Sequence, residues 1–324
     1  MLVSAGFVLL GLVLLVLGGD WLVRGASGIA LLARLTPAVV GLTVVAAGTS
    51  MPEMVVSVQA GLRGSPDLSM GNVVGSNIFN VVAILGIAAL VHPLRIASSS
   101  VRLEWPVMFL ASFQLVLLGR DGEIDRLEAA YFFTCMVVFV TFMVYVARRA
   151  PKAEKEDYAE EMVTASFGRT GGLAWVFNLV AVGVGVALLI FGANALVKGA
   201  VEIALGLGLS EAVVGLTVVA AGTSMPELAA SVMAARRGRD DIAVANVIGS
   251  NLFNILAILG VAGMVKPIPV AAEILERDLW WMLGVAALMF PMMLTGRRIS
   301  RGEGAILMIV FVAYLALLVR SQLG

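Results

Sequence analysis

The sequence predicts an all-α integral membrane protein with ten membrane-spanning helices, arranged as two inverted five-helix repeats. Three observations support this fold class. Of the 324 residues, 60% are hydrophobic and only 14% are charged, and the mean hydropathy is +1.00. The hydrophobic residues gather in segments of about 20 residues or more, the length that crosses a bilayer. The two halves of the chain also carry the same motifs. This composition excludes a soluble enzyme, a disordered chain and a nucleic-acid-binding protein.

Each half contains five candidate spans, whose ends we place from hydrophobicity and turn residues. In the first half, 1–147, they cover about 2–32, 37–62, 68–90, 103–119 and 124–147. In the second half, 172–324, they cover about 172–206, 211–235, 241–264, 275–295 and 302–320. The connection 148–171 contains the charged run PKAEKEDYAEE. We predict that it is a solvated linker, too short to form a folded domain.

The duplication is visible at a constant offset of 174 residues. The sixteen residues AVVGLTVVAAGTSMPE at 38–53 recur unchanged at 212–227. The segment GNVVGSNIFNVVAILG at 71–86 matches ANVIGSNLFNILAILG at 245–260. Because each half has an odd number of spans, the second copy must start on the opposite side of the membrane. The result is an inverted repeat, which is typical of secondary transporters.

The positive charges in the connections predict the orientation, because cytoplasmic connections are enriched in Lys and Arg. Fourteen of the 22 Lys and Arg residues lie on the side that carries the 148–171 linker, and six lie on the other side. We therefore expect a multi-pass protein of the cell (plasma) membrane with a cytoplasmic linker. Both termini are expected outside the cytoplasm.

Two carboxylates, Glu53 and Glu227, lie within otherwise apolar spans. An ionisable group there costs a few kcal/mol or more, so it usually faces a cavity and marks an ion path. Each glutamate follows a proline in the sequence GTSMPE. The proline frees the carbonyl four residues before it, and a broken helix is tolerated only where it lines protein or a cavity. Freed carbonyls beside a carboxylate are hard oxygen ligands, suited to Na⁺ or Ca²⁺.

Helical spacing gathers more oxygen-bearing groups around these carboxylates, because residues three, four and seven apart share a face. Inversion would bring the faces of the two copies together near the midplane and form a cage without soft ligands, which disfavours zinc and copper. The faces comprise Ala46, Thr49 and Glu53; Asn72, Ser76 and Asn80; Ala220, Thr223 and Glu227; and Asn246, Ser250 and Asn254.

Packing alone could explain some of these polar residues. Asn72 and Asn246 either belong to the cage or donate hydrogen bonds between helices. Asp20, which aligns with Asn194, precedes Arg24 by one helical turn, and this spacing favours a structural ion pair. Two inverted copies of an intramembrane glutamate favour an ion site more strongly than packing.

The paired motifs GLTVVAAGTSMPE and GNVVGSNIFN, repeated as GLTVVAAGTSMPEL and NVIGSNLFN, resemble the two alpha repeats of the sodium/calcium exchanger family, within the cation/calcium antiporter superfamily. The resemblance is to a prokaryotic member and covers nearly the whole chain. It implies transport by alternating access. Spans 2–5 and 7–10 would form the ion-carrying bundle, and the long, tilted spans 1 and 6 would slide across it.

The resemblance also implies a metal-ion transport site with two central carboxylates for which Ca²⁺ and Na⁺ compete. Hydroxyl, amide and backbone carbonyl oxygens would complete it. In chain order, the implied ligands are Ala46, Thr49, Glu53, Ser76, Asn80, Ala220, Thr223, Glu227, Ser250 and Asn254. The serines that follow the two threonines, Ser50 and Ser224, would line the ion path.

Asn254 is a departure from many members of the family, which carry an aspartate at this position. Here it matches Asn80 in the first repeat, so the cage has two carboxylates and a formal charge of −2. That charge balances one Ca²⁺ or two Na⁺, whereas a third Na⁺ would add an uncompensated charge in the membrane. Because a buried glutamate can bind a proton, coupling to H⁺ stays open as well.

We therefore predict a secondary active antiporter that exchanges Na⁺ for Ca²⁺. It is not an enzyme and has no cofactor. The alternative is a Ca²⁺/H⁺ or K⁺-dependent exchanger on the same fold, and a cation channel is less favoured. The expected partners are the transported ions and the lipid bilayer, without nucleic acid. A monomer is sufficient for this mechanism, and a dimer is an alternative.

Overall fold

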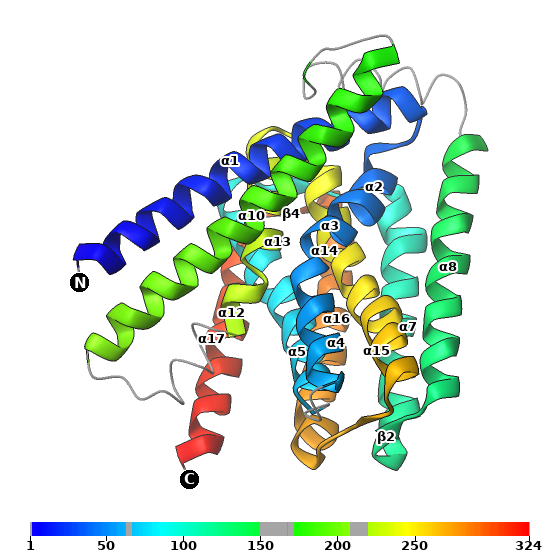
Figure 1. Cartoon of the computed structure of the whole chain (residues 1–324). Coiled ribbons are helices and arrows are strands. Elements are labelled where there is room, and N and C mark those ends of the chain that lie inside the picture. The colour runs from blue at the N-terminus through cyan, green and yellow to red at the C-terminus, as the bar shows by residue number, and fades with distance from the viewer. Residues whose placement is uncertain (1, 63–66, 150–166, 168–171, 208–219, 324) are drawn as a thin grey trace.

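The computed structural model describes residues 2–62, 67–149, 167, 172–207 and 220–323, and this part of the chain is almost entirely helical (Figure 1). Eight helical segments in it are long and apolar enough to cross a membrane. The pair Pro37–Thr49 and Met51–Leu62, bent by 48°, forms a ninth. The predicted span 211–235 lies partly outside the described residues. The predicted fold of an all-helical membrane protein is confirmed.

The elements below keep the labels of Figure 1. The α-helices are α1 (Leu2–Ala33), α2 (Pro37–Val40), α3 (Ala46–Thr49), α4 (Met51–Leu62), α5 (Asp67–Phe79), α6 (Leu85–Val91), α7 (Trp105–Leu118), α8 (Arg126–Arg149), α10 (Gly172–Gly206), α12 (Ala220–Thr223), α13 (Met225–Arg236), α14 (Asp240–Leu252), α15 (Leu259–Val265), α16 (Leu279–Leu294) and α17 (Arg301–Leu323). The π-helical turns are η1 (Gly41–Val45), η2 (Asn80–Ile84), η3 (Ser100–Glu104), η6 (Phe253–Ile258) and η7 (Ile274–Asp278), and the 3-10 turns are η4 (Gly119–Asp121) and η8 (Thr295–Arg297). The strands are β1 (Leu94–Arg95), β2 (Glu123–Ile124), β3 (Ile268–Pro269) and β4 (Arg298–Ile299).

The observed spans begin and end within a few residues of the predicted ones. One difference is at the start of the predicted linker 148–171, where α8 continues to Arg149. The rest of that linker, apart from Phe167, lies outside the described residues. The sequence also gave no indication of the four two-residue strands.

The short strands show how the two halves fit together. β1 pairs with β4 and β2 pairs with β3, both antiparallel, so each pair takes one strand from each half. Leu94 corresponds to Ile268 at the offset of 174. The two pairs are therefore related by the duplication and tie connections of opposite halves together, as an inverted repeat requires.

The centre of the bundle is formed by the segments that carry the GSNxFN motifs. In the most apolar 18-residue stretch of Leu68–Val91, 78% of the residues are buried, and in that of Asp240–Val265, 94% are buried. None of the other six single-helix spans among the described residues exceeds 39%. In lipid these outer helices keep exposed apolar surfaces, whereas the two motif-bearing spans are shielded on nearly all sides. The motif residues therefore lie away from lipid.

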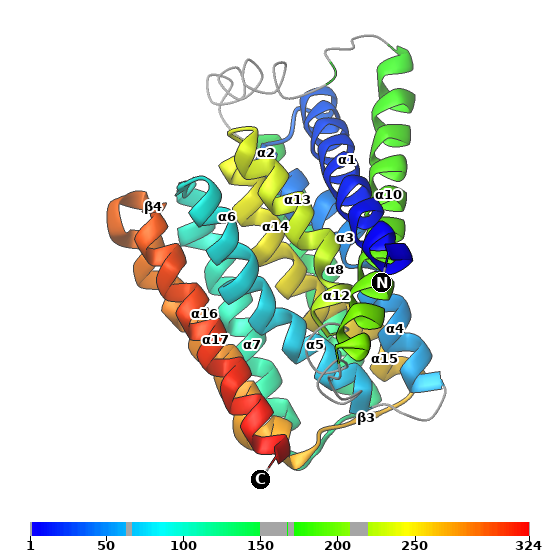
Figure 2. The same ribbon diagram turned by 90° about the vertical axis from the view of Figure 1, so that its left-hand side faces the viewer.

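The long helices α1 and α10 lie side by side and antiparallel, tilted across one face of the other helices (Figures 1 and 2). Gly11, Gly18 and Gly25 recur every seven residues on α1, and their copies on α10 are Gly185, Gly192 and Gly199. A Cβ atom on Gly185 would lie only 2.6 Å from the backbone nitrogen of Leu22. Glycine is needed here because the two backbones touch, which is how small residues hold membrane helices together.

We predict that Gly185→Ala destabilises the protein, because the new methyl group overlaps the backbone of α1. Overpacking of this kind costs about 1–3 kcal/mol. The matched control is Gly183→Ala on the same helix, where an added Cβ meets nothing within 4 Å. Thermal unfolding in detergent should give a lower midpoint for Gly185→Ala, and an unchanged or higher midpoint for Gly183→Ala. Equal midpoints for the two variants would contradict direct backbone packing.

Candidate functional site

The second span is broken at Ser50, and the corresponding residue of the second repeat, Ser224, also separates two helices. Ser50 has φ −83° and ψ 9°, and Ser224 has φ −90° and ψ 10°. A proline follows two residues later in each copy, so its ring sits in the first turn of the next helix, where no donor is lost. The break predicted from the proline is confirmed. It brings one glutamate into the first turn of α4 and the other into the first turn of α13.

Both glutamates, Glu53 and Glu227, are buried, with exposed fractions of 1% and 2%. Each lies near a helix N-terminus, where the backbone dipole favours negative charge. Each accepts a hydrogen bond from a serine of the other repeat, and this contact holds the two carboxylates near each other. Their shared burial brings the two copies of the motif together, as the inversion of the repeats led us to expect.

Hydroxyl groups link each carboxylate to the opposite repeat. Ser50 Oγ donates to Glu227 Oε1 at 2.8 Å, and Ser224 Oγ lies 3.2 Å from Glu53 Oε1. Ser224 Oγ also lies 3.2 Å from the hydroxyl of Ser76. The serines predicted to line the ion path thus contact the carboxylates directly. These contacts fix one oxygen of each glutamate and leave the other oxygen for a different partner.

Several buried oxygens at this site have no hydrogen-bond partner in the described part of the chain. They come from both repeats, and each residue is at most 2% exposed. An unpaired polar atom in a membrane interior is costly, so such a cluster needs a ligand that supplies positive charge. The atoms are Glu53 Oε2, Glu227 Oε2, Asn80 Oδ1, Asn254 Oδ1 and Ser250 Oγ.

Two further asparagines, Asn77 and Asn251, position the amides of the cage. Asn80 Nδ2 donates to Asn251 Oδ1 at 2.9 Å, and Asn254 Nδ2 donates to Asn77 Oδ1 at 3.0 Å. The Asn80 and Asn254 amides therefore each donate a hydrogen bond through Nδ2 and keep Oδ1 available for a ligand. Sequence reasoning missed both residues, although their identity in the two copies of GSNxFN is a signal that could have found them.

Asn72 and Asn246, whose role the sequence left open, bind next to the glutamates. Asn72 Nδ2 donates to Ser57 Oγ at 3.1 Å and lies 3.5 Å from the backbone oxygen of Glu53. Asn246 Nδ2 donates to a serine hydroxyl at 2.9 Å and lies 3.5 Å from the backbone oxygen of Glu227. The Asn72 amide therefore joins α5 to α4, and the Asn246 amide joins α14 to α13, in each case next to the glutamate.

The remaining predicted ligands lie at the ends of the broken helices. Thr49 is buried at the end of α3, and its hydroxyl donates to the backbone oxygen of Ala46 at 3.3 Å. Thr223 is half-buried at the end of α12. Ala220 begins that helix, and its side chain lies outside the described residues.

The donor set is made of oxygen atoms only, which suits hard cations such as Na⁺ and Ca²⁺ and not soft transition metals. No group of three or more His, Cys, Asp or Glu side chains that could hold a metal occurs among the described residues. Two carboxylates thus supply the formal charge of the cage, and neutral oxygens supply the rest. The arrangement can bind one divalent cation or two monovalent cations with full charge compensation.

We predict that Asn251→Leu weakens Ca²⁺ binding although residue 251 supplies no cage oxygen. The substitution removes the acceptor that orients the Asn80 amide, and loss of one such bond should lower the affinity about tenfold. Asn251→Asp keeps an acceptor and should bind Ca²⁺ more tightly than Asn251→Leu. The Ca²⁺ affinities of the wild type, Asn251→Leu and Asn251→Asp are compared through the Ca²⁺-dependent rise of their melting temperatures in detergent. Equal Ca²⁺ responses in the wild type and the leucine variant would refute the positioning role.

Comparison with known proteins shows the family of the chain. The chain matches the family described as sodium/calcium exchanger protein over residues 3–145 and 177–320. It is 33% identical to the sodium/calcium exchanger MaX1 of Methanosarcina acetivorans, covering 96% of this chain and 97% of that protein. It is 35% identical to the inner membrane protein YrbG of Escherichia coli, covering 98% and 97% of the two chains. A solved structure of the sodium-calcium exchanger NCX_Mj superposes with a TM-score of 0.82 at 28% identity, over 98% of this chain and 99% of that one. The chain belongs to the sodium/calcium exchanger family.

Proposed function

We propose that this protein is an antiporter that moves Ca²⁺ against Na⁺ across the cell membrane, with the cage around Glu53 and Glu227 as its transport site. The observation that carries the proposal is the set of buried, unpartnered oxygens contributed by both repeats. Membership of the exchanger family and the similarity to MaX1 and NCX_Mj support the choice of ions. The ligands are those implied by the motifs, with the oxygens of Asn80 and Asn254 held by Asn251 and Asn77.

Competition for the two carboxylates couples the ions. One Ca²⁺ or two Na⁺ neutralise Glu53 and Glu227, so either load can be carried through the membrane interior without net charge. The empty cage would leave two bare carboxylates in a medium of low dielectric constant, which is strongly unfavourable. Return of the empty site is therefore suppressed, and exchange is favoured over a leak.

Alternating access requires the cage to open to each side in turn. We assign the movement to α1 and α10, which share a glycine-rich backbone contact and so move as one body. In this conformation Asp20 of α1 is hydrogen-bonded to Arg237 at the end of α13, and it lies 3.6 Å from Arg24. The ion pair with Arg237 links the moving pair to the bundle and has to break when the pair slides.

We also propose how the chain is divided into repeats and how it is oriented in the membrane. Residues 1–147 and 172–324 form the two repeats, and the connection 148–171 lies in the cytoplasm with both termini on the other side. In Figure 1 the C-terminal ends of α17 and of α8 lie at opposite ends of the bundle, which supports placing the linker and the C-terminus on opposite sides. Because one chain holds both halves of the cage, a monomer is sufficient for this mechanism, and a dimer stays an alternative.

We predict that vesicles loaded with Na⁺ and diluted into Na⁺-free buffer accumulate radioactive Ca²⁺, and that Glu53→Gln abolishes this uptake. The substitution keeps the shape of the side chain and removes half of the cage charge. Glu123→Gln, an exposed residue of β2, is the control and should transport normally. The uptake measurement compares the three proteins at equal reconstitution.

Three results would contradict this function. If Ca²⁺ moved under an imposed pH gradient but never under a Na⁺ gradient, the chain would be a proton-coupled exchanger. If uptake required K⁺ together with Na⁺, the K⁺-dependent alternative would hold. Unitary currents in planar bilayers would instead indicate a channel.

A further prediction concerns charge. Since two carboxylates balance two Na⁺ or one Ca²⁺, we expect wild-type uptake to be unaffected by a K⁺ diffusion potential set with valinomycin. Asn254→Asp adds a third carboxylate to the cage and should make the uptake rate respond to that potential. A wild-type rate that changes with voltage would show that an uncompensated charge moves in each cycle.

A further inference from the structure

A second buried carboxylate, Glu104, lies outside the cage, where η3 joins α7. Its side chain is 0% exposed, and one of its oxygens accepts a hydrogen bond from Ser100 Oγ at 2.8 Å. The other oxygen, Oε1, is buried and has no partner. An unsatisfied carboxylate oxygen in the membrane is costly, and the proposed transport mechanism does not use it. The unpaired oxygen of Glu104 therefore needs a ligand other than the transported ions.

The second repeat shows what this position requires. Glu104 corresponds to Asp278 at the offset of 174. Asp278 is satisfied from within the chain, since the guanidinium of Arg277 lies 2.8 and 3.1 Å from its oxygens and the hydroxyl of Tyr314 lies at 3.3 Å. In the first repeat Leu103 stands in place of Arg277. The first copy thus keeps the acid and lacks the neighbouring cationic donor.

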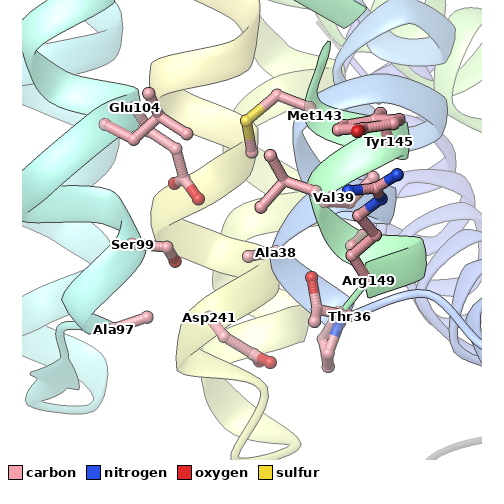
Figure 3. Close-up of a pocket in the computed structure, with 14 residues that line it drawn as sticks. Thr36, Ala38, Val39, Ala97, Ser99, Glu104, Met143, Tyr145, Arg149 and Asp241 are labelled. Carbon is pink, nitrogen blue, oxygen red and sulfur yellow. The ribbon is translucent and has the colours of Figure 1, made fainter. Parts of the chain in front are cut away.

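Glu104 borders a cavity of about 390 Å³ between α2, α8, α14 and η3 (Figure 3). The carboxylate of Glu104 points toward its centre, and Asp241 lies below it. The apolar wall includes Val39, Met143 and Val146. The Asp241 carboxylate is paired with Arg239 at 2.8 Å, so the cavity presents one unpaired acid, Glu104, beside a hydrocarbon-like surface.

The opposite wall of this cavity is formed by the last two turns of α8. Tyr145 is half exposed, and the guanidinium of Arg149 lies 4.4 Å from the centre of its ring. An exposed tyrosine followed by arginine at a helix end is typical of the membrane interface, where lipid headgroups lie. Pockets between helices with basic residues at this level bind phosphate headgroups. The cavity thus combines a phosphate-binding group with a buried acceptor for an ammonium group.

We propose that this cavity binds a phospholipid whose headgroup carries a primary ammonium, as in phosphatidylethanolamine. The ammonium group donates to Glu104 Oε1, as the guanidinium of Arg277 does to Asp278, and the phosphate pairs with Arg149. An acyl chain covers Met143 and Val146. A primary ammonium has N–H groups to donate, whereas the quaternary ammonium of phosphatidylcholine has none. The unpaired carboxylate of Glu104 also disfavours phospholipids with a net negative charge. This lipid site is independent of which ions the protein exchanges.

The test is native mass spectrometry of the full-length protein, released from micelles that contain equal amounts of phosphatidylethanolamine and phosphatidylcholine. The wild type should retain one phosphatidylethanolamine about tenfold more often than phosphatidylcholine, the ratio expected for one hydrogen bond to a charged group. Glu104→Gln should lose this preference. Glu276→Gln, an exposed acid near the start of the corresponding span of the second repeat, is the matched control and should keep it.

Arg149→Gln provides an independent variant at an exposed position, so it remains informative if Glu104→Gln fails to fold. It should lower retention of both lipids alike, because both carry the phosphate. Thermal unfolding verifies the fold of each variant. Equal retention of the two lipids by the wild type would overturn the proposal, as would an undiminished preference in folded Glu104→Gln. Displacement of the lipid by millimolar free ethanolamine would also overturn it, because the site would then take a small amine instead of a lipid.

Discussion

The burial of two carboxylates, Glu53 and Glu227, in a bundle surrounded by hydrocarbon is the constraint on which the other features of the structure depend. Neither charge is stable there alone, and together they repel each other. The broken helices place them in first turns, where the backbone dipoles favour negative charge, and serines of the opposite repeat bind one oxygen of each. The atoms that these contacts leave unsatisfied are oxygens, the ligands that hard cations prefer. We propose that a cation supplies the missing charge there; the empty site is then unfavourable in the membrane, and this couples the movement of one ion to that of another.

The duplicated sequence builds this site symmetrically, but the two copies differ where their surroundings differ. The hydroxyl of Ser76 has a partner in Ser224, whereas that of Ser250 has none among the described residues. The acids Glu104 and Asp278 occupy matching positions, and Arg277 pairs with only the second. The residues of the proposed cage match in the two repeats. Outside the cage, Leu103 stands where the second repeat has Arg277, and this difference leaves Glu104 without the guanidinium that Asp278 has.

Much of the fold could be predicted from the sequence, because spans are long and apolar and the repeat is exact over sixteen residues. The break at Ser50 could be predicted as well, since a proline in a helix has a local effect. What could not be predicted depends on contacts between distant segments. Asn77 and Asn251 matter through hydrogen bonds across the repeats, and the two strand pairs join connections about 200 and about 145 residues apart. Asp20 likewise pairs with Arg237 in addition to Arg24, which was the only partner visible from local spacing.

Equilibrium binding of radioactive Ca²⁺ to the purified protein in detergent tests the shared cation cage without requiring transport or vesicles. We predict one Ca²⁺ per chain, displaced competitively and cooperatively by Na⁺, and no Ca²⁺ bound by the double variant Glu53→Gln/Glu227→Gln. Ca²⁺ that stayed bound in the double variant would place the ion elsewhere. Ca²⁺ and Na⁺ that bound independently of each other would contradict a shared cage.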